Sequence, residues 1–153
     1  MKKLLTGLLA LAFLCLSGSA YDQMGGTNGR NMTNISVVRH QFVMQYGVDP
    51  KYASLKNPLR RTATNINDGR WLYGQDCAAC HGPKGWGDGE AGKNLNPLPS
   101  NIAALNSMRM TTDGYLYWAI AEGGVQLGTA MPPFKNTLKV DEIWKIILYL
   151  RTL

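Results

Sequence analysis

Two stretches in the first third of the chain have the residue pattern of short helices. Residues 35–46 carry apolar side chains three and four positions apart, which is the spacing of one helix face. The pattern predicts an amphipathic helix that ends at Gly47. Asp49 and Pro50 then offer a cap and a first-turn proline for a helical turn through Leu55. The apolar face of the first helix consists of Ile35, Val38, Phe42 and Tyr46.

A third helix is predicted immediately before the first of two closely spaced cysteines. Asn67 or Asp68 is its expected cap, and the helix runs to Cys77. Residues 82–89 follow with four glycines and a proline, which is the composition of a loop. This part of the chain is therefore expected to be a helix followed by an irregular segment.

Two more helices are predicted at 113–122 and 141–150. Thr111 or Thr112 caps the first of them, and the glycine pair after residue 122 ends it. No segment alternates between apolar and polar residues strongly enough for a sheet, so the expected fold class is all-α. The apolar pattern of the last helix consists of Ile143, Trp144, Ile147, Leu148 and Tyr149.

The first 20 residues have the pattern of a secretory signal peptide. Two lysines precede an almost unbroken apolar run over residues 4–16, and Gly18 and Ala20 supply the small residues of a cleavage site. Cleavage after Ala20 predicts a periplasmic protein, and an uncleaved signal would leave a membrane-anchored form. Because Cys15 is removed with the signal, the mature chain keeps two of the three cysteines.

Charge is unevenly distributed along the mature chain. Residues 21–66 hold six basic and two acidic residues, a net charge of +4, whereas residues 67–153 hold eight of each. A basic segment can steer an acidic partner or touch an anionic lipid surface, and it can equally serve solubility alone. We therefore divide the mature chain into an N-terminal extension at 21–66 and a compact domain at 67–153.

Residues 77–81 read Cys-Ala-Ala-Cys-His, which is the attachment signature of c-type haem. Two cysteines one helical turn apart can each form a thioether with one vinyl group of the porphyrin, and the adjacent histidine can ligate the iron. Cys77 and Cys80 are thus the candidate anchors and His81 the candidate proximal ligand. A thioredoxin-like pair needs a βαβ context, and a structural zinc site needs four ligands, and the sequence offers neither.

Haem iron takes a sixth ligand or keeps an open position, and three methionines follow the motif. Met131 lies 50 residues after His81, in a segment that contains two prolines. Because prolines restrict the backbone, this segment can hold a thioether in a fixed direction. Met131 is therefore the candidate ligand, whereas Met108 and Met110 are more simply explained as core residues.

Residues 67–153 resemble the class I c-type cytochromes, and most closely the single-haem domains of soluble carriers and of oxidase and dehydrogenase cytochrome subunits. The resemblance implies an all-α fold wrapped around one covalently attached haem c, with His81 and Met131 axial and Gly69 where the first and last helices cross. Lys139 departs from the family, which usually has Ser or Thr as the cap of the last helix. The resemblance lies in Gly69…Tyr73…Cys77, the haem motif, Thr-Ala-Met131-Pro132 and the closing helix with Ile143, Trp144 and Tyr149.

Two further expectations concern the surroundings of the haem. The family places a proline-containing segment on the proximal side, here 94–100, so a carbonyl near Pro97 or Pro99 is expected to accept from His81 Nδ1. Trp118 or Arg109 is expected near a haem propionate, with core filling as the alternative for Trp118.

The sequence thus predicts an electron-transfer cytochrome rather than an enzyme. His and Met ligands would fill both axial positions, so the iron would change oxidation state without binding a substrate, and redox proteins are the expected donor and acceptor. The first rival is a haem enzyme or gas sensor with a labile sixth ligand, for which His40 and Arg109 are the obvious distal residues. The second is a docked subunit of a larger oxidoreductase, held through residues 21–66. That segment is not expected to be needed for haem ligation.

Overall fold

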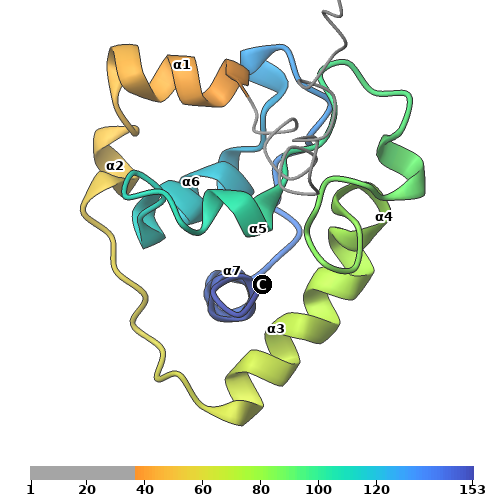
Figure 1. The fold of residues 1–153 in the computed structure, drawn as a ribbon. Helices are drawn as coiled ribbons and strands as arrows, with labels where there is room; N and C mark the ends of the chain where they lie inside the picture. The colour runs from red at the N-terminus through yellow and green to blue at the C-terminus, as the bar shows by residue number, and fades with distance from the viewer. Residues whose placement is uncertain (1–36) are drawn as a thin grey trace, which may run out of the picture.

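A computed structural model describes residues 37–153, which fold into helices joined by loops and contain no β-strand (Figure 1). The predicted signal peptide, Ile35 and the first part of the extension lie outside the described residues. The helical composition confirms the predicted all-α class. The helices are α1 (Val37–Tyr46), α2 (Pro50–Ala53), α3 (Ala63–Asp76), α4 (Ala78–His81), α5 (Ile102–Leu105), α6 (Asp113–Glu122) and α7 (Val140–Leu150), with 3₁₀ turns η2 (Glu90–Gly92) and η3 (Val125–Leu127).

Several helix ends lie where local chemistry predicts them. Thr112 caps α6 by accepting a hydrogen bond from the backbone N of Tyr115, and Gly123 ends the helix at φ +64°. α1 ends before Gly47, which has a φ of +79°. Asp49 caps α2, which ends two residues before the predicted Leu55.

Helix α3 begins earlier than predicted. Its cap is Thr62, whose hydroxyl accepts from the backbone N of Asn65 at 3.2 Å. Asn67 and Asp68 therefore lie inside the helix, and the prediction that one of them caps it is wrong. Thr62 is the cap because its backbone is extended and its side-chain oxygen accepts from the N–H three positions later, which would otherwise lack a partner in the first turn. The division placed between residues 66 and 67 falls within this helix.

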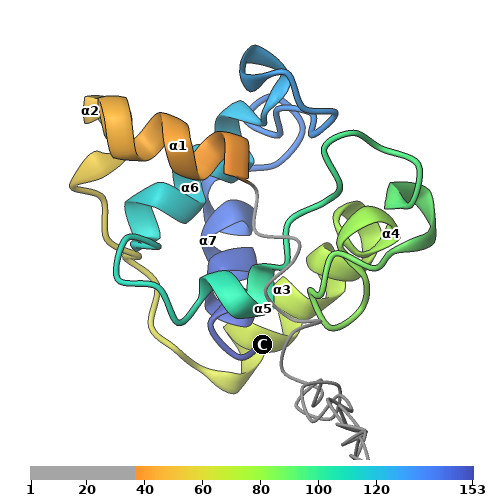
Figure 2. The same cartoon turned by 45° about the horizontal axis from the view of Figure 1, so that its top comes forward.

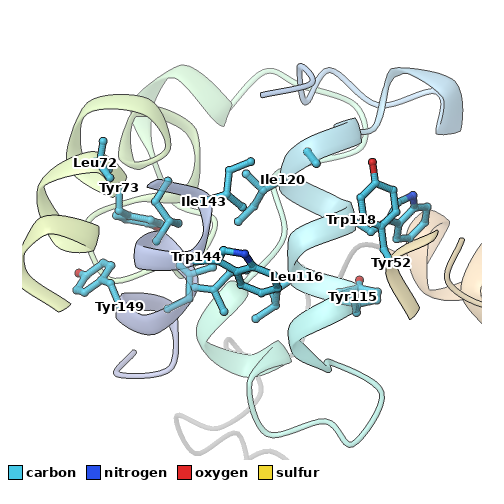
Figure 3. Packing of buried hydrophobic residues seen from close by; sticks show 14 residues of the cluster. Tyr52, Leu72, Tyr73, Tyr115, Leu116, Trp118, Ile120, Ile143, Trp144 and Tyr149 are labelled. Carbon is cyan, nitrogen blue, oxygen red and sulfur yellow. The ribbon is translucent and has the colours of Figure 1, made fainter. Parts of the chain in front are cut away.

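The centre of the fold is the crossing of α3 and α7 (Figure 2). A Cβ at Gly69 would lie 2.0 Å from the carbonyl oxygen of Lys145, so the two backbones approach closely there and need glycine. The crossing thus lies at Gly69, where the resemblance placed it, and it meets α7 one turn before Tyr149. The ring centroids of Tyr73 and Tyr149 lie 5.2 Å apart. Figure 3 shows both side chains at one end of the buried cluster.

Helix α7 starts without a conventional side-chain cap. Its N-cap residue is Lys139, whose backbone N donates to the Glu142 carboxylate at 2.7 Å. This contact is one half of a capping box, and the apolar face of α7 provides the rest of the stabilisation. The expected departure from the family at this position is thus present, and the helix still packs in the core.

Helices α1 and α2 pack on α6, so the described part of the N-terminal extension lies against the domain (Figures 1 and 2). Phe42 stacks on Trp118 at 5.9 Å between ring centroids. Tyr52 is buried, and its hydroxyl donates to the Glu122 carboxylate. The side chain of Asn57 donates to the backbone oxygen of Trp144 at 2.8 Å. Within residues 37–153, no helix is both long enough and apolar enough to cross a bilayer.

Candidate haem site

A cavity brings the four predicted site residues together. Cys77, Cys80 and His81 line it from the start and the body of α4, and Met131 lines it from the loop that follows α6. The open space measures about 840 Å³, including the part that is continuous with solvent. Apolar side chains make up most of the remaining wall, namely Leu95, Pro97, Leu98, Pro99, Pro132 and Phe134.

The motif is positioned by the helix before it and the loop after it. α4 follows α3 directly, and the hydroxyl of Tyr73 on α3 donates to the carbonyl of Gly82 at 2.7 Å. The backbone N of Gly87 donates back to the carbonyl of His81 at 2.8 Å. One helical turn separates the two cysteines, and both are half-buried. The turn therefore presents both sulfurs and the imidazole to the same cavity.

The imidazole of His81 is oriented by a backbone carbonyl. Its Nδ1 lies 3.0 Å from the carbonyl oxygen of Ser100, and because a carbonyl only accepts, Nδ1 carries the proton. Burial lowers the pKa of His81, and the bond to Ser100 partly opposes that shift. The ring is therefore neutral at pH 7, with the lone pair of Nε2 available to a metal. The acceptor lies within the expected 94–100 segment, one residue beyond Pro99.

The Met131 loop is bound to the end of α6 by backbone contacts. The backbone N of Gly124 donates to the carbonyl of Met131 at 2.8 Å, and that of Phe134 donates to Ile120 at 3.1 Å. A Cβ at Gly123 would lie 2.5 Å from the carbonyl carbon of Pro132, so glycine permits this close approach. The structure thus places the backbone of Met131 firmly beside the cavity.

The other two candidate methionines lie elsewhere. Met108 and Met110 are half-buried and are not among the residues that line the cavity. Neither belongs to the buried core cluster or to the apolar side chains packed against it, so their role as packing residues stays a prediction. Of the three methionines that follow the motif, the structure brings Met131 to the cavity wall.

The chemistry of the cavity fits a haem better than the rival cofactors. Burial, followed by the nearby Asp76 and Cys80, raises the pKa of the Cys77 thiol to about 12, whereas redox-active cysteines have lowered pKa values. Among residues 37–153, no three His, Cys, Asp or Glu side chains are grouped so as to hold a metal ion. Two thiols, a neutral imidazole and a thioether around an apolar space are the groups that a c-type haem requires.

Arg39 of α1 is a cavity residue that the sequence analysis missed. It is 6% exposed, lines the same cavity, and donates from Nη2 to the carbonyl of Gly123 at 2.6 Å. Its guanidinium lies 4.7 Å from the ring centroid of Trp118. Burial lowers the pKa of Arg39, and Tyr115 raises it. The sequence offered one signal for Arg39, because this basic residue lies next to Val38 and one turn before Phe42, on the face predicted to pack on the domain.

The residues expected near a propionate or at a distal position do not line the cavity. Arg109 is exposed and is not among the residues that line the cavity. Trp118 is buried at 4% exposure and packs in the core without lining the cavity, which agrees with the core-filling alternative. His40 does not line the cavity either.

Comparison with known proteins shows which family the domain belongs to. The family described as cytochrome c oxidase, cbb3-type, subunit III matches residues 64–150, which is more than half of the chain. The chain belongs to this family. It is therefore a class I c-type cytochrome, and proteins of this class bind haem and transport electrons.

A solved structure supports the same conclusion. The chain is similar to one in the reducing HAO-like protein complex of Kuenenia stuttgartiensis, with 26% sequence identity and a TM-score of 0.54. The similarity covers 72% of this cytochrome and 53% of the other chain, so the cytochrome spans about half the length of that relative. No curated protein sequence was found to match.

Proposed function

We propose that this cytochrome moves one electron at a time between redox proteins through a single haem c. Cys77 and Cys80 would hold the haem by thioethers, and His81 and Met131 would be its axial ligands. The observation that carries the proposal is that all four side chains line one apolar cavity. A haem bound there supplies a one-electron iron couple, and the protein supplies ligation and orientation.

The residues around the cavity are suited to a stable electron carrier. The bond from His81 Nδ1 to the Ser100 carbonyl fixes the ring plane and makes Nε2 a stronger donor. A thioether from Met131 and apolar walls both favour ferrous iron, which raises the reduction potential. Both ligands would come from backbone segments that are anchored by hydrogen bonds, so little has to move when the charge changes.

A haem enzyme or gas sensor is less well supported. It needs an open iron position and an acid–base residue beside it. The two residues that the sequence offered for this role, His40 and Arg109, do not line the cavity. Arg39 does line it, but a guanidinium keeps its proton in proteins and so cannot serve as the acid–base residue.

We further propose export to the periplasm and docking to a larger oxidoreductase. Export rests on the signal-peptide pattern of residues 1–20. Docking is supported by the membership of a family of oxidase subunits and by the similarity to a chain of a protein complex. The basic character of residues 21–66 favours an acidic surface on the partner.

The mass of the purified protein under denaturing conditions tests attachment and processing together. We expect a chain that starts at Tyr21 and carries the added mass of one haem. Changing both Cys77 and Cys80 to alanine should abolish that added mass, whereas Cys15→Ala, in the predicted signal, should leave it unchanged. A wild-type chain without added mass, or with two haems, would contradict the proposed site. A start at Met1 would contradict cleavage alone.

A further inference from the structure

The cavity receives one charged residue from outside the family domain. Arg39 lies in α1, whereas the family match begins at residue 64. In both views of the fold, α1 lies over α6 and beside the loop that carries Met131 (Figures 1 and 2). A segment that is absent from the minimal domain thus supplies part of the cavity wall.

The guanidinium of Arg39 is held in a defined position. Nη2 donates to the Gly123 carbonyl at 2.6 Å, and the group lies 4.7 Å from the centroid of Trp118. The ring of Trp118 also contacts those of Phe42 and Tyr115, at centroid distances of 5.9 Å and 6.2 Å. Such a buried and stacked arginine loses little further side-chain entropy when it binds another group.

The chemistry of haem supplies a matching group for this arginine. Haem carries two propionate carboxylates, and a guanidinium has five N–H donors in a planar fork that suits a carboxylate. A carboxylate that enters an apolar cavity requires hydrogen bonds or an opposite charge to remain ionised. Asp76, also on the wall, has the wrong sign for this purpose.

We propose that Arg39 binds a haem propionate, so that helix α1 forms part of the haem site. The inference rests on the proposed attachment of haem at Cys77 and Cys80. It assigns to the N-terminal extension a role in the potential of the iron, which differs from docking to a partner. Arg39 acts here as a positioning residue, because it touches the cofactor edge and does not ligate the metal.

Two effects on the iron follow from this contact. A fixed positive charge at the cavity wall favours the ferrous state, and it keeps the propionate ionised through neutral pH. Loss of the charge should lower the potential and make it depend on pH as the propionate takes up a proton. The other titratable groups that line the cavity are Asp76, Cys77, Cys80 and His81, and Tyr115 faces Arg39 from α6.

The test compares three full-length, haem-loaded variants by potentiometric titration between pH 5 and 8. Arg39→Gln keeps a donor for the Gly123 carbonyl and removes the charge, and Arg39→Lys keeps the charge without the fork. Arg109→Gln is the control, because it removes an exposed arginine that does not line the cavity. We expect Arg39→Gln to shift the redox equilibrium about tenfold toward ferric iron, which is about 59 mV for one electron.

The outcome depends on how far each substitution changes the reduction potential and on whether that change varies with pH. The proposal expects a potential for Arg39→Lys between those of Arg39→Gln and the wild type, and a new pH dependence in Arg39→Gln that the control lacks. The proposal would be overturned if the redox equilibrium constant of Arg39→Gln stayed within twofold of the wild-type value and its potential showed no new pH dependence. If that variant does not fold, a crystal structure of the haem-loaded wild type decides by the presence or absence of a hydrogen bond from Arg39 to a propionate. A wild type without attached haem would instead refute the proposed function.

Discussion

Replacing Gly69 by alanine tests the close crossing of α3 and α7, on which the position of the haem motif depends. A Cβ at residue 69 would lie 2.0 Å from the carbonyl oxygen of Lys145 and 2.5 Å from its carbonyl carbon. Close C···O contacts in proteins are about 3.3 Å, so the helices would have to separate by roughly 1.3 Å. The obstructing atoms are backbone, which cannot rotate away as a side chain would.

The expected change in the free energy of unfolding of Gly69→Ala is the sum of two opposing effects. Overpacking of this kind costs about 1–3 kcal/mol, and we expect the upper end because the separation also loosens buried Leu72, Tyr73, Ile146 and Ile147. Alanine is a better helix former than glycine by about 1 kcal/mol, which offsets part of that cost. The net loss in the free energy of unfolding should therefore be about 2 kcal/mol.

Gly74→Ala is the matched control on the same helix. A Cβ at residue 74 meets no atom within 4 Å, so the substitution should raise the free energy of unfolding by about 0.5–1 kcal/mol. Urea titration of the haem-loaded variants, followed by circular dichroism, measures both changes under one condition. A Gly69→Ala protein that is as stable as the wild type or as Gly74→Ala would refute the close crossing.

Two other predictions concern the sixth ligand and the ion pair between Glu122, the last residue of α6, and Lys135. Met131→Ala should remove the ferric thioether-to-iron absorption band and lower the potential, whereas Met108→Ala should leave both unchanged; the reverse result would move the ligand to Met108. Lys135, and next the Tyr52 hydroxyl, hold the pKa of Glu122 below its usual value, so this carboxylate stabilises the fold above about pH 4.3 and less as the pH falls through the lowered pKa. Lys135→Met should cost less than about 1 kcal/mol at pH 7, because the pair is part-exposed, and nearly nothing at pH 3. Equal losses at both pH values in urea titrations would contradict that assignment.

Features that depend on neighbouring residues could be read from the sequence. The cap at Thr112, the stop at Gly123 and the start of α2 at Pro50 all follow from local backbone chemistry. The one-turn helix α5 was not predicted, since its four residues are too few for a periodic pattern. Its cap is the side chain of Asn101, which accepts from the backbone N of Ala104 at 2.9 Å.

The residues of the candidate site also differ in how far the sequence could predict them. Cys77, Cys80 and His81 are adjacent in sequence, so one motif predicts them as a group. Met131 was identified from the prolines that follow it and from the resemblance, because the 49 residues between it and His81 contain no local signal of their proximity. Arg39 reaches the cavity by packing on Trp118, a contact between residues 79 positions apart, and such a contact cannot be inferred from spacing.

The visible spectrum of the full-length ferrous protein, before and after addition of carbon monoxide, tests the central claim most directly. If His81 and Met131 fill both axial positions, as proposed for an electron carrier, carbon monoxide should leave the low-spin spectrum unchanged at neutral pH. Met131→Ala provides the positive control, because it opens the iron and should bind the gas. A wild-type spectrum that shifts to that of a carbon monoxide complex would contradict the account and favour a haem enzyme or gas sensor.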